Sequence, residues 1–190
     1  MQEACFGEIQ HGHMEQVGYD TYCKLLDEVL KEMQGIEIKE EQDIQIDLAV
    51  SSYIPEEYIE SSSQKIEIYQ DIALCRTEED IENVIDEIID RYGTMPDEIM
   101  NLIEITRIKE LARNLGIIKI SEKMDSIIFL YDNNKFNFEV LNDLVKKYGS
   151  NIKFSKGIQP YITLKMKKIS DKQILNDVKG FLTLNFIDKE

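Results

Sequence analysis

The chain has 190 residues, of which 43% are apolar and 31% are charged, a composition typical of a folded globular protein rather than a disordered one. No apolar run approaches the ~20 residues needed to cross a bilayer, and the first residues lack the basic region and apolar stretch of a signal peptide. The three cysteines are widely spaced and odd in number, so no disulfide framework is expected and a cytoplasmic location is predicted.

The net charge of −15 is unevenly distributed along the chain. Residues 1–100 carry 6 lysines and arginines against 26 acidic residues, whereas residues 101–190 carry 16 against 11. An acidic front half repels phosphate and is therefore a poor candidate for nucleic-acid binding. Two alternatives follow for this half: a solvated acidic face, or a surface that meets a basic protein.

The first segment of the chain contains one predicted helix. Residues 19–33 place their apolar side chains on a single stripe, and Gly35 follows as a helix stop. The charged run 37–42 is the best candidate boundary, which divides the chain into a segment 1–36 and a domain 37–190.

A strand and a helix are predicted next. Polar and apolar residues alternate over 43–50, as in a half-buried strand, and Pro55 opens a short helical turn. Residues 61–75 are predicted to be helical. The side chains expected to face inward on this helix are Ile66, Tyr69, Ile72 and Ala73.

The two helices that follow have the clearest signals. Thr77 and Asp80 have the spacing of a capping box, and Gly93 is placed to end the helix that begins there. Pro96 suits the start of the next helix, and Gly116 suits its end. The predicted inward stripes are Ile81, Val84, Ile85, Ile88 and Tyr92 on the first helix, and Ile99, Leu102, Ile103, Thr106, Leu111 and Leu115 on the second.

The rest of the chain alternates between strands and helices. Strands are predicted at 117–121, 126–131, 151–155 and 161–166, and helices at 138–148 and from Ser170 or Asp171 to about 186. Strand pairs with short connections favour an α+β fold, in which helical segments precede a small, mostly antiparallel sheet packed against helices.

No motif of a catalytic site is present. The sequence has no glycine-rich phosphate loop, no dinucleotide fingerprint, no nucleophile elbow and no His-Glu-x-x-His. We therefore expect neither enzymatic activity nor a cofactor from this chain. Cys5, His11, His13 and Cys23 are a conceivable zinc set, but solitary cysteines do not have the paired spacing of structural zinc sites, so no metal is expected. A small metal-dependent enzyme built on His11, His13 and Cys5 is the third and least favoured alternative.

The segment from Gly7 to Tyr22 resembles the end of the translocation motif in the transcription-repair coupling factor family and its branch-migrating helicase relatives. The matching positions are Gly7, Gln10, Gly12, His13 and Gly18. The sequence departs at His11, where a serine is usual, and at Ala4-Cys5-Phe6, where an Asn-Leu-Leu-like run is usual. The resemblance implies that the chain begins inside this motif and lacks the ATP-driven motor.

Three further strings resemble the terminal domain of the same family. They are Ile54–Ile59, Asp90-Arg91-Tyr92-Gly93-Thr94-Met95-Pro96 and Ala112–Ile117. The Asp-Arg-aromatic-Gly-x-x-Pro string between two amphipathic helices is the most specific. The resemblance extends over about residues 7–120, and beyond them only the order of elements agrees.

The resemblance implies a regulatory role rather than catalysis. In the family this domain packs on an amino-terminal module that resembles UvrB, masks the surface that recruits UvrA, and is released when the motor, an ATP-dependent DNA translocase, engages RNA polymerase on duplex DNA. Glu87 and Asp90 match positions that pair with basic residues there. Glu79 and Asp86 lie in the same acid-rich segment and complete the candidate partner-binding set.

A nucleic-acid-binding accessory module is the second alternative, based on residues 7–18 and the basic back half. The run Lys165-Met166-Lys167-Lys168 near Tyr161 is consistent with it. We favour a solvated strand end for these lysines and expect Tyr161 to pack on a strand face.

Overall fold

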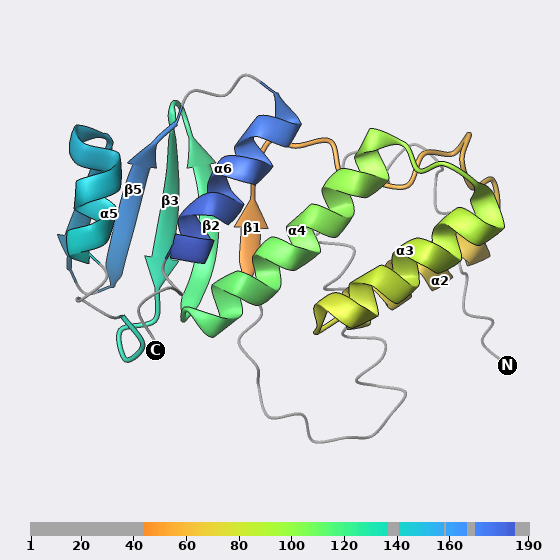
Figure 1. Ribbon diagram of the computed structural model, residues 1–190, viewed down its shortest axis with the longest axis horizontal. Helices are drawn as coiled ribbons and strands as arrows, with labels where there is room; N and C mark the ends of the chain where they lie inside the picture. Colours follow the sequence, from red (N-terminus) through yellow and green to blue (C-terminus); the bar gives the residue numbers. More distant parts are fainter. Residues whose placement is uncertain (1–43, 137–140, 158, 167–169, 185–190) are drawn as a thin grey trace, which may run out of the picture. The chain divides into compact units, whose positions relative to one another are not determined.

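The computed structural model describes residues 44–136, 141–157, 159–166 and 170–184. All of them lie in Ile38–Glu190, the second of two units into which the chain divides. The described residues form five α-helices and one five-stranded sheet, in the chain order shown in Figure 1. The elements are β1 (Gln45–Asp47), α2 (Ser62–Leu74), α3 (Glu78–Tyr92), α4 (Asp97–Asn114), β2 (Ile117–Lys123), β3 (Ser126–Tyr131), α5 (Leu141–Tyr148), the 3-10 turn η1 (Gly149–Asn151), β4 (Ile152–Lys156), β5 (Pro160–Lys165) and α6 (Asp171–Leu184).

The sheet has the strand order β1-β2-β3-β5-β4. The short strand β1 runs parallel to β2, and the other three pairs are antiparallel. A bulge between Ile117 and Lys119 shifts the register of β2 against β3, which keeps Ile117 and Ile120 both on the buried face. The predicted α+β class, with a mostly antiparallel sheet packed against helices, is confirmed.

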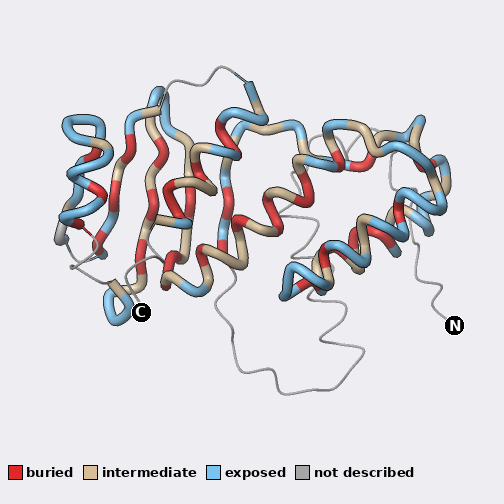
Figure 2. The backbone as a smooth tube through the Cα atoms, viewed as in Figure 1, coloured by how far each residue is buried: buried red, intermediate tan, exposed pale blue. Residues whose placement is uncertain are grey.

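One face of the sheet is covered by helices. Ile46, Ile120, Phe129 and Ile162 are partners in adjacent strands and are all buried, so they form one row of the core. Phe129 stacks on Phe181 of α6, with ring centroids 4.1 Å apart. Helix α4 contacts both α6 and β2, and the buried residues of these elements form the core coloured red in Figure 2.

Helix α2 buries a different stripe from the one predicted. Tyr69 and Ile72 are buried as expected, but Ile66 is 40% exposed and Ile68 is fully buried in its place. Apolar residues occur on both sides of this helix, so periodicity alone did not choose between them. The hydroxyl oxygen of Tyr69 accepts a hydrogen bond from the Ile54 N–H at 2.8 Å, which fixes the orientation of the helix.

Helices α3 and α4 follow their predicted bounds closely. On α3, Ile81 and Ile88 are buried and the rest of the predicted stripe is half-buried. On α4, the predicted Leu111 and Leu115 are only half-buried. Three residues outside the predicted α4 stripe are buried, because this helix contacts α2 as well as the sheet and α6. They are Ile105, Ile108 and Ala112.

Candidate interaction surface

The acid-rich helix α3 begins at a complete capping box. The Asp80 N–H donates to the Thr77 hydroxyl at 3.1 Å, and the Thr77 N–H donates to the Asp80 carboxylate at 2.8 Å. The backbone N–H of Arg76, with the hydroxyl and N–H of Thr77, lowers the pKa of Asp80. Asp80 therefore serves the local structure of the helix and is not available as a docking charge.

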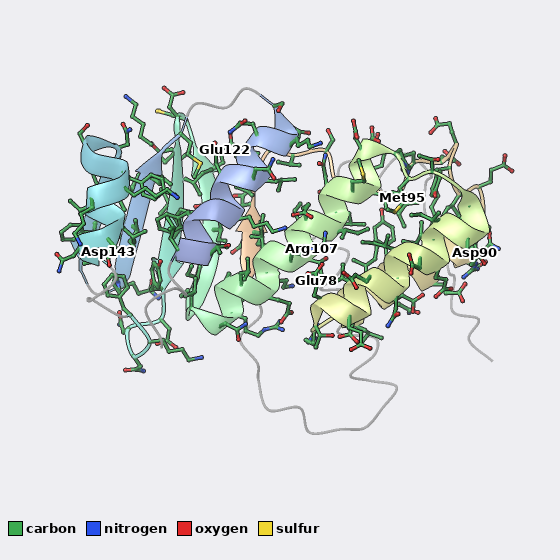
Figure 3. The ribbon with its side chains drawn as sticks, viewed as in Figure 1. Glu78, Asp90, Met95, Arg107, Glu122 and Asp143 are labelled. Carbon is green, nitrogen blue, oxygen red and sulfur yellow. The ribbon has the colours of Figure 1, made fainter. Side chains whose placement is uncertain are left out.

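Glu78 is also used inside the domain. Its carboxylate accepts from the Arg107 Nε at 2.8 and 3.1 Å, and Arg107 donates in turn to Glu104 of the same helix. Lys179 of α6 donates to the other oxygen of Glu104 at 2.9 Å. This chain of charges connects α3, α4 and α6, and Figure 3 shows Glu78 and Arg107 facing one another. Burial raises the pKa of Glu104, but the hydrogen bonds from Lys179 and Arg107 outweigh burial and hold it below its ordinary value.

Glu87, one of the predicted partner-binding residues, forms an internal ion pair. The Arg91 Nη1 donates to Glu87 at 2.8 Å, and Nη2 of the same guanidinium lies 3.3 Å from Glu67 of α2. Arg91 thus connects α2 to α3, and it neutralises part of the charge that Glu87 would otherwise present.

The other acids of α3 gather on one exposed face. Glu79, Glu82, Asp86 and Asp90 are separated by steps of three or four residues, so they follow one side of the helix over ~16 Å. We call this set the acidic stripe. Its four carboxylates form no ion pair or hydrogen bond with any other described residue. Ile89, which is 46% exposed, lies along its margin.

The string Asp90-Arg91-Tyr92-Gly93 builds the corner at the end of α3. Tyr92 packs against Tyr58 with ring centroids 5.9 Å apart, and the Arg91 guanidinium lies over the Tyr92 ring at 5.2 Å. The Tyr58 hydroxyl donates to the Gly93 carbonyl at 2.8 Å. Gly93 has φ 85° and ψ −155°, a conformation that is essentially restricted to glycine. Asp90 is exposed and lies near the end of α3, where Figure 3 labels it.

The structure therefore places three of the four predicted partner-binding residues, Glu79, Asp86 and Asp90, on the acidic stripe, and it pairs Glu87 with Arg91. Glu82 completes the acidic stripe but was not among the partner-binding residues predicted from the sequence. Its spacing of three residues from Glu79 and four from Asp86 was the signal that identifies it.

The predicted remnant of the translocation motif lies outside the described residues. This concerns Gly7, Gln10, Gly12, His13 and Gly18, and also the conceivable zinc set of Cys5, His11, His13 and Cys23. Within the described ranges, no three His, Cys, Asp or Glu side chains are grouped so as to hold a metal ion. None of the helices described is long and apolar enough to span a membrane.

The fold of the described residues has a solved counterpart. A crystal structure titled as the C-terminal domain of transcription-repair coupling factor superimposes with a TM-score of 0.66 and 23% identity, covering 78% of this chain and 96% of that one. The chain thus belongs to the class of proteins that contain an α+β domain with the fold of that structure.

Sequence comparison identifies the domain itself. Residues 48–140 match the TRCF domain family. A transcription-repair-coupling factor of Staphylococcus epidermidis is 40% identical over 123 residues, which are 64% of this chain and 10% of that protein. The corresponding protein of Borreliella burgdorferi is 29% identical over 171 residues, which are 90% of this chain and 15% of that protein. The chain contains a TRCF domain and spans about a tenth to a seventh of the length of these relatives. The resemblance stated from the sequence is confirmed.

Proposed function

We propose that the chain is a non-catalytic regulatory module, whose acidic stripe docks on a basic surface of a UvrB-like amino-terminal module of the parent transcription-repair coupling factor. The docked state masks the surface that recruits UvrA, so the module holds the parent protein in a repressed form. The parent is an ATP-dependent DNA translocase that acts on RNA polymerase stalled on duplex DNA.

The observation that carries the proposal is the division of the acids on α3. Glu78, Asp80 and Glu87 are held by hydrogen bonds inside the domain, whereas the acidic stripe has no described partner. Four like charges along ~16 Å of one helix repel one another, and a basic surface relieves that repulsion. The stripe is thus the part of α3 whose charge is available for a second protein.

The strength of such contacts suits a switch. An exposed ion pair contributes about 0–1 kcal/mol, so four pairs and the apolar contact of Ile89 give a weak interface. A partner that binds only the released state can then shift the equilibrium, because the opposing free energy is a few kcal/mol.

The test is binding of the 190-residue chain to the separate UvrB-like module by isothermal titration calorimetry. Asp86→Arg with Asp90→Arg should weaken binding at least tenfold at moderate salt. A control with the same change in net charge, Asp125→Arg with Asp143→Arg, should leave it within twofold. Equal affinities for the stripe variant and the unmodified chain would refute the assignment.

A second pair of variants separates the stripe from the rest of α3. Glu82→Arg should weaken binding more than Glu87→Arg, because the Glu87 charge is already paired with Arg91. The opposite order would show that the surface is centred on Glu87, as the sequence first indicated.

A further inference from the structure

The face of the sheet opposite the helices carries a separate charged surface. Side chains on this face are those that alternate with the buried row of Ile46, Ile120, Phe129 and Ile162. We call this surface the lysine face. Its residues are Lys119, Ser121 and Lys123 on β2, Ser126, Ile128 and Leu130 on β3, Tyr161, Thr163 and Lys165 on β5, and Lys153 and Ser155 on β4.

Four lysines surround the lysine face. Lys123 and Lys165 both flank Ser126 in adjacent strands, Lys153 lies opposite Thr163, and Lys119 lies opposite Leu130. The first three are exposed and Lys119 is half-buried. Within the described residues none of the four has an ion pair, and Asp47 on β1 is the one carboxylate that the described strands place on this face. The face is therefore strongly basic on a chain whose net charge is −15.

The centre of the lysine face is apolar. Leu130 and Tyr161 are direct partners on β3 and β5, and Ile128 lies two residues along β3, so the three side chains are contiguous. Tyr161 lies on a strand face, as expected from the sequence, and is 38% exposed. Contiguous apolar side chains with a charged rim are typical of an interaction site.

The turn at one end of this face is strained. Met124 in the two-residue turn between β2 and β3 has φ 54° and is 90% exposed, although this conformation favours glycine or asparagine. Lys123 precedes it and is part of the rim. Met124 is thus a large apolar side chain that is exposed to solvent at this end of the sheet.

We infer that the lysine face binds an acidic amphipathic helix of a partner protein. A helix is ~10 Å wide and neighbouring strands are ~4.8 Å apart, so one helix laid on β3 and β5 covers Ile128, Leu130 and Tyr161. Its flanking carboxylates then reach the lysines of β2 and β4. This surface is distinct from the acidic stripe, and the inference does not depend on the function proposed for α3.

The chemistry of the face favours such a helix over a nucleic acid. Single strands are bound on several aromatic side chains on which bases stack, and the described strands place only Tyr161 on this face. Ile128 and Leu130 offer no stacking surface and no hydrogen bonds to bases.

The test uses fluorescence anisotropy with the 190-residue chain and a labelled synthetic 18-residue helix, with leucine at i, i+3, i+4 and i+7 and glutamate on both flanks. The unmodified chain should bind this probe, and Lys153→Glu with Lys165→Glu should weaken binding at least tenfold. The control is Lys147→Glu with Lys172→Glu, which changes the net charge by the same amount at positions outside the lysine face. It should leave the dissociation constant of the probe within twofold of that of the unmodified chain. Tyr161→Ser should weaken binding about fivefold through the apolar centre.

Three outcomes overturn the inference. One is absence of binding of the probe to the unmodified chain at 50 mM salt, and another is an equal loss in the two lysine pairs. The third is tighter binding of an 18-nucleotide oligo(dT) than of the peptide, which assigns the face to nucleic acid. Because none of these variants changes α3, the calorimetric test of the acidic stripe gives an independent result.

Discussion

Replacing Arg107 with methionine should lower the free energy of unfolding by about 2 kcal/mol. Methionine keeps most of the apolar stem, so the loss reports mainly on the charged hydrogen bonds. The Glu78 side chain is 58% exposed, and that pair contributes ~0.5 kcal/mol. The Glu104 side chain is 27% exposed and its hydrogen bond to Arg107 is half-buried, so it contributes ~1.5 kcal/mol.

The assay is urea unfolding of the 190-residue chain followed by far-ultraviolet circular dichroism. The midpoint should fall with an unchanged slope, because the surface exposed on unfolding stays the same. Lys146→Met removes an exposed ion pair with Asp143 on α5 and should cost less than 0.5 kcal/mol. If Arg107→Met costs no more than Lys146→Met, the charges that connect α3, α4 and α6 do not stabilise the fold.

The remaining predictions concern titration, backbone conformation and burial. The pKa of Glu104 is lowered in the folded state, so its contribution is present above the unfolded pKa of 4.5 and is lost as pH falls through the folded value. Acid unfolding below about pH 4.5 should therefore be less steep in Glu104→Gln than in the unmodified chain, and parallel curves would contradict this. Gly93→Ala should lower the free energy of unfolding by about 1–3 kcal/mol, because alanine is strained at the positive φ of this position. An added β-carbon would meet no other atom there, so the loss, measured by thermal unfolding, reports on backbone conformation alone. Ile68→Ala should cost about 2–4 kcal/mol but Ile66→Ala less than 1 kcal/mol in urea unfolding, and the reverse order would restore the stripe expected from the sequence.

The local signals of the sequence were reliable because they act within one turn of a helix. Thr77 and Asp80 form the predicted capping box, and Gly93 and Gly116 end α3 and α4 with φ of 85° and 70°. At Gly116 an added β-carbon would also collide with the β-carbon of Lys135, so the position requires glycine for space as well as for conformation. The capping box and the positive φ of the two glycines depend on neighbouring residues alone, whereas the approach of Lys135 to Gly116 depends on the tertiary structure.

Burial on a helix with two apolar sides was not predictable. Ile66 and Ile68 are equally apolar, and the choice between them was decided by Tyr69 and its hydrogen bond to Ile54 in a separate segment. Helix α4 buries more of its circumference than one stripe for a similar reason, because it contacts α2, β2 and α6. The number of neighbours around a helix depends on tertiary packing, and periodicity does not report it.

The candidate site was predicted in part. An acid-rich helix was evident from composition, and three members of the acidic stripe were identified by their position in it. Glu87 was included because it matches a family position, and in the structure it pairs with Arg91, which also reaches Glu67 on another helix. Glu82 was omitted although its spacing from Glu79 and Asp86 was readable in the sequence. Whether a carboxylate is neutralised depends on which basic side chain the tertiary structure places next to it.

By itself, the sequence determined the order of the described helices and strands, the ends of α3 and α4, the α+β class and the family, since these depend on short-range patterns and on matching strings. Only the tertiary structure decided which charges are already satisfied and which faces are open. It paired Glu78 with Arg107, left the acidic stripe free of described partners, and placed four lysines and Tyr161 on one face of the sheet. The physical reason is that ion pairs and sheet register join residues far apart in the chain, and their distances are set only when the whole domain packs.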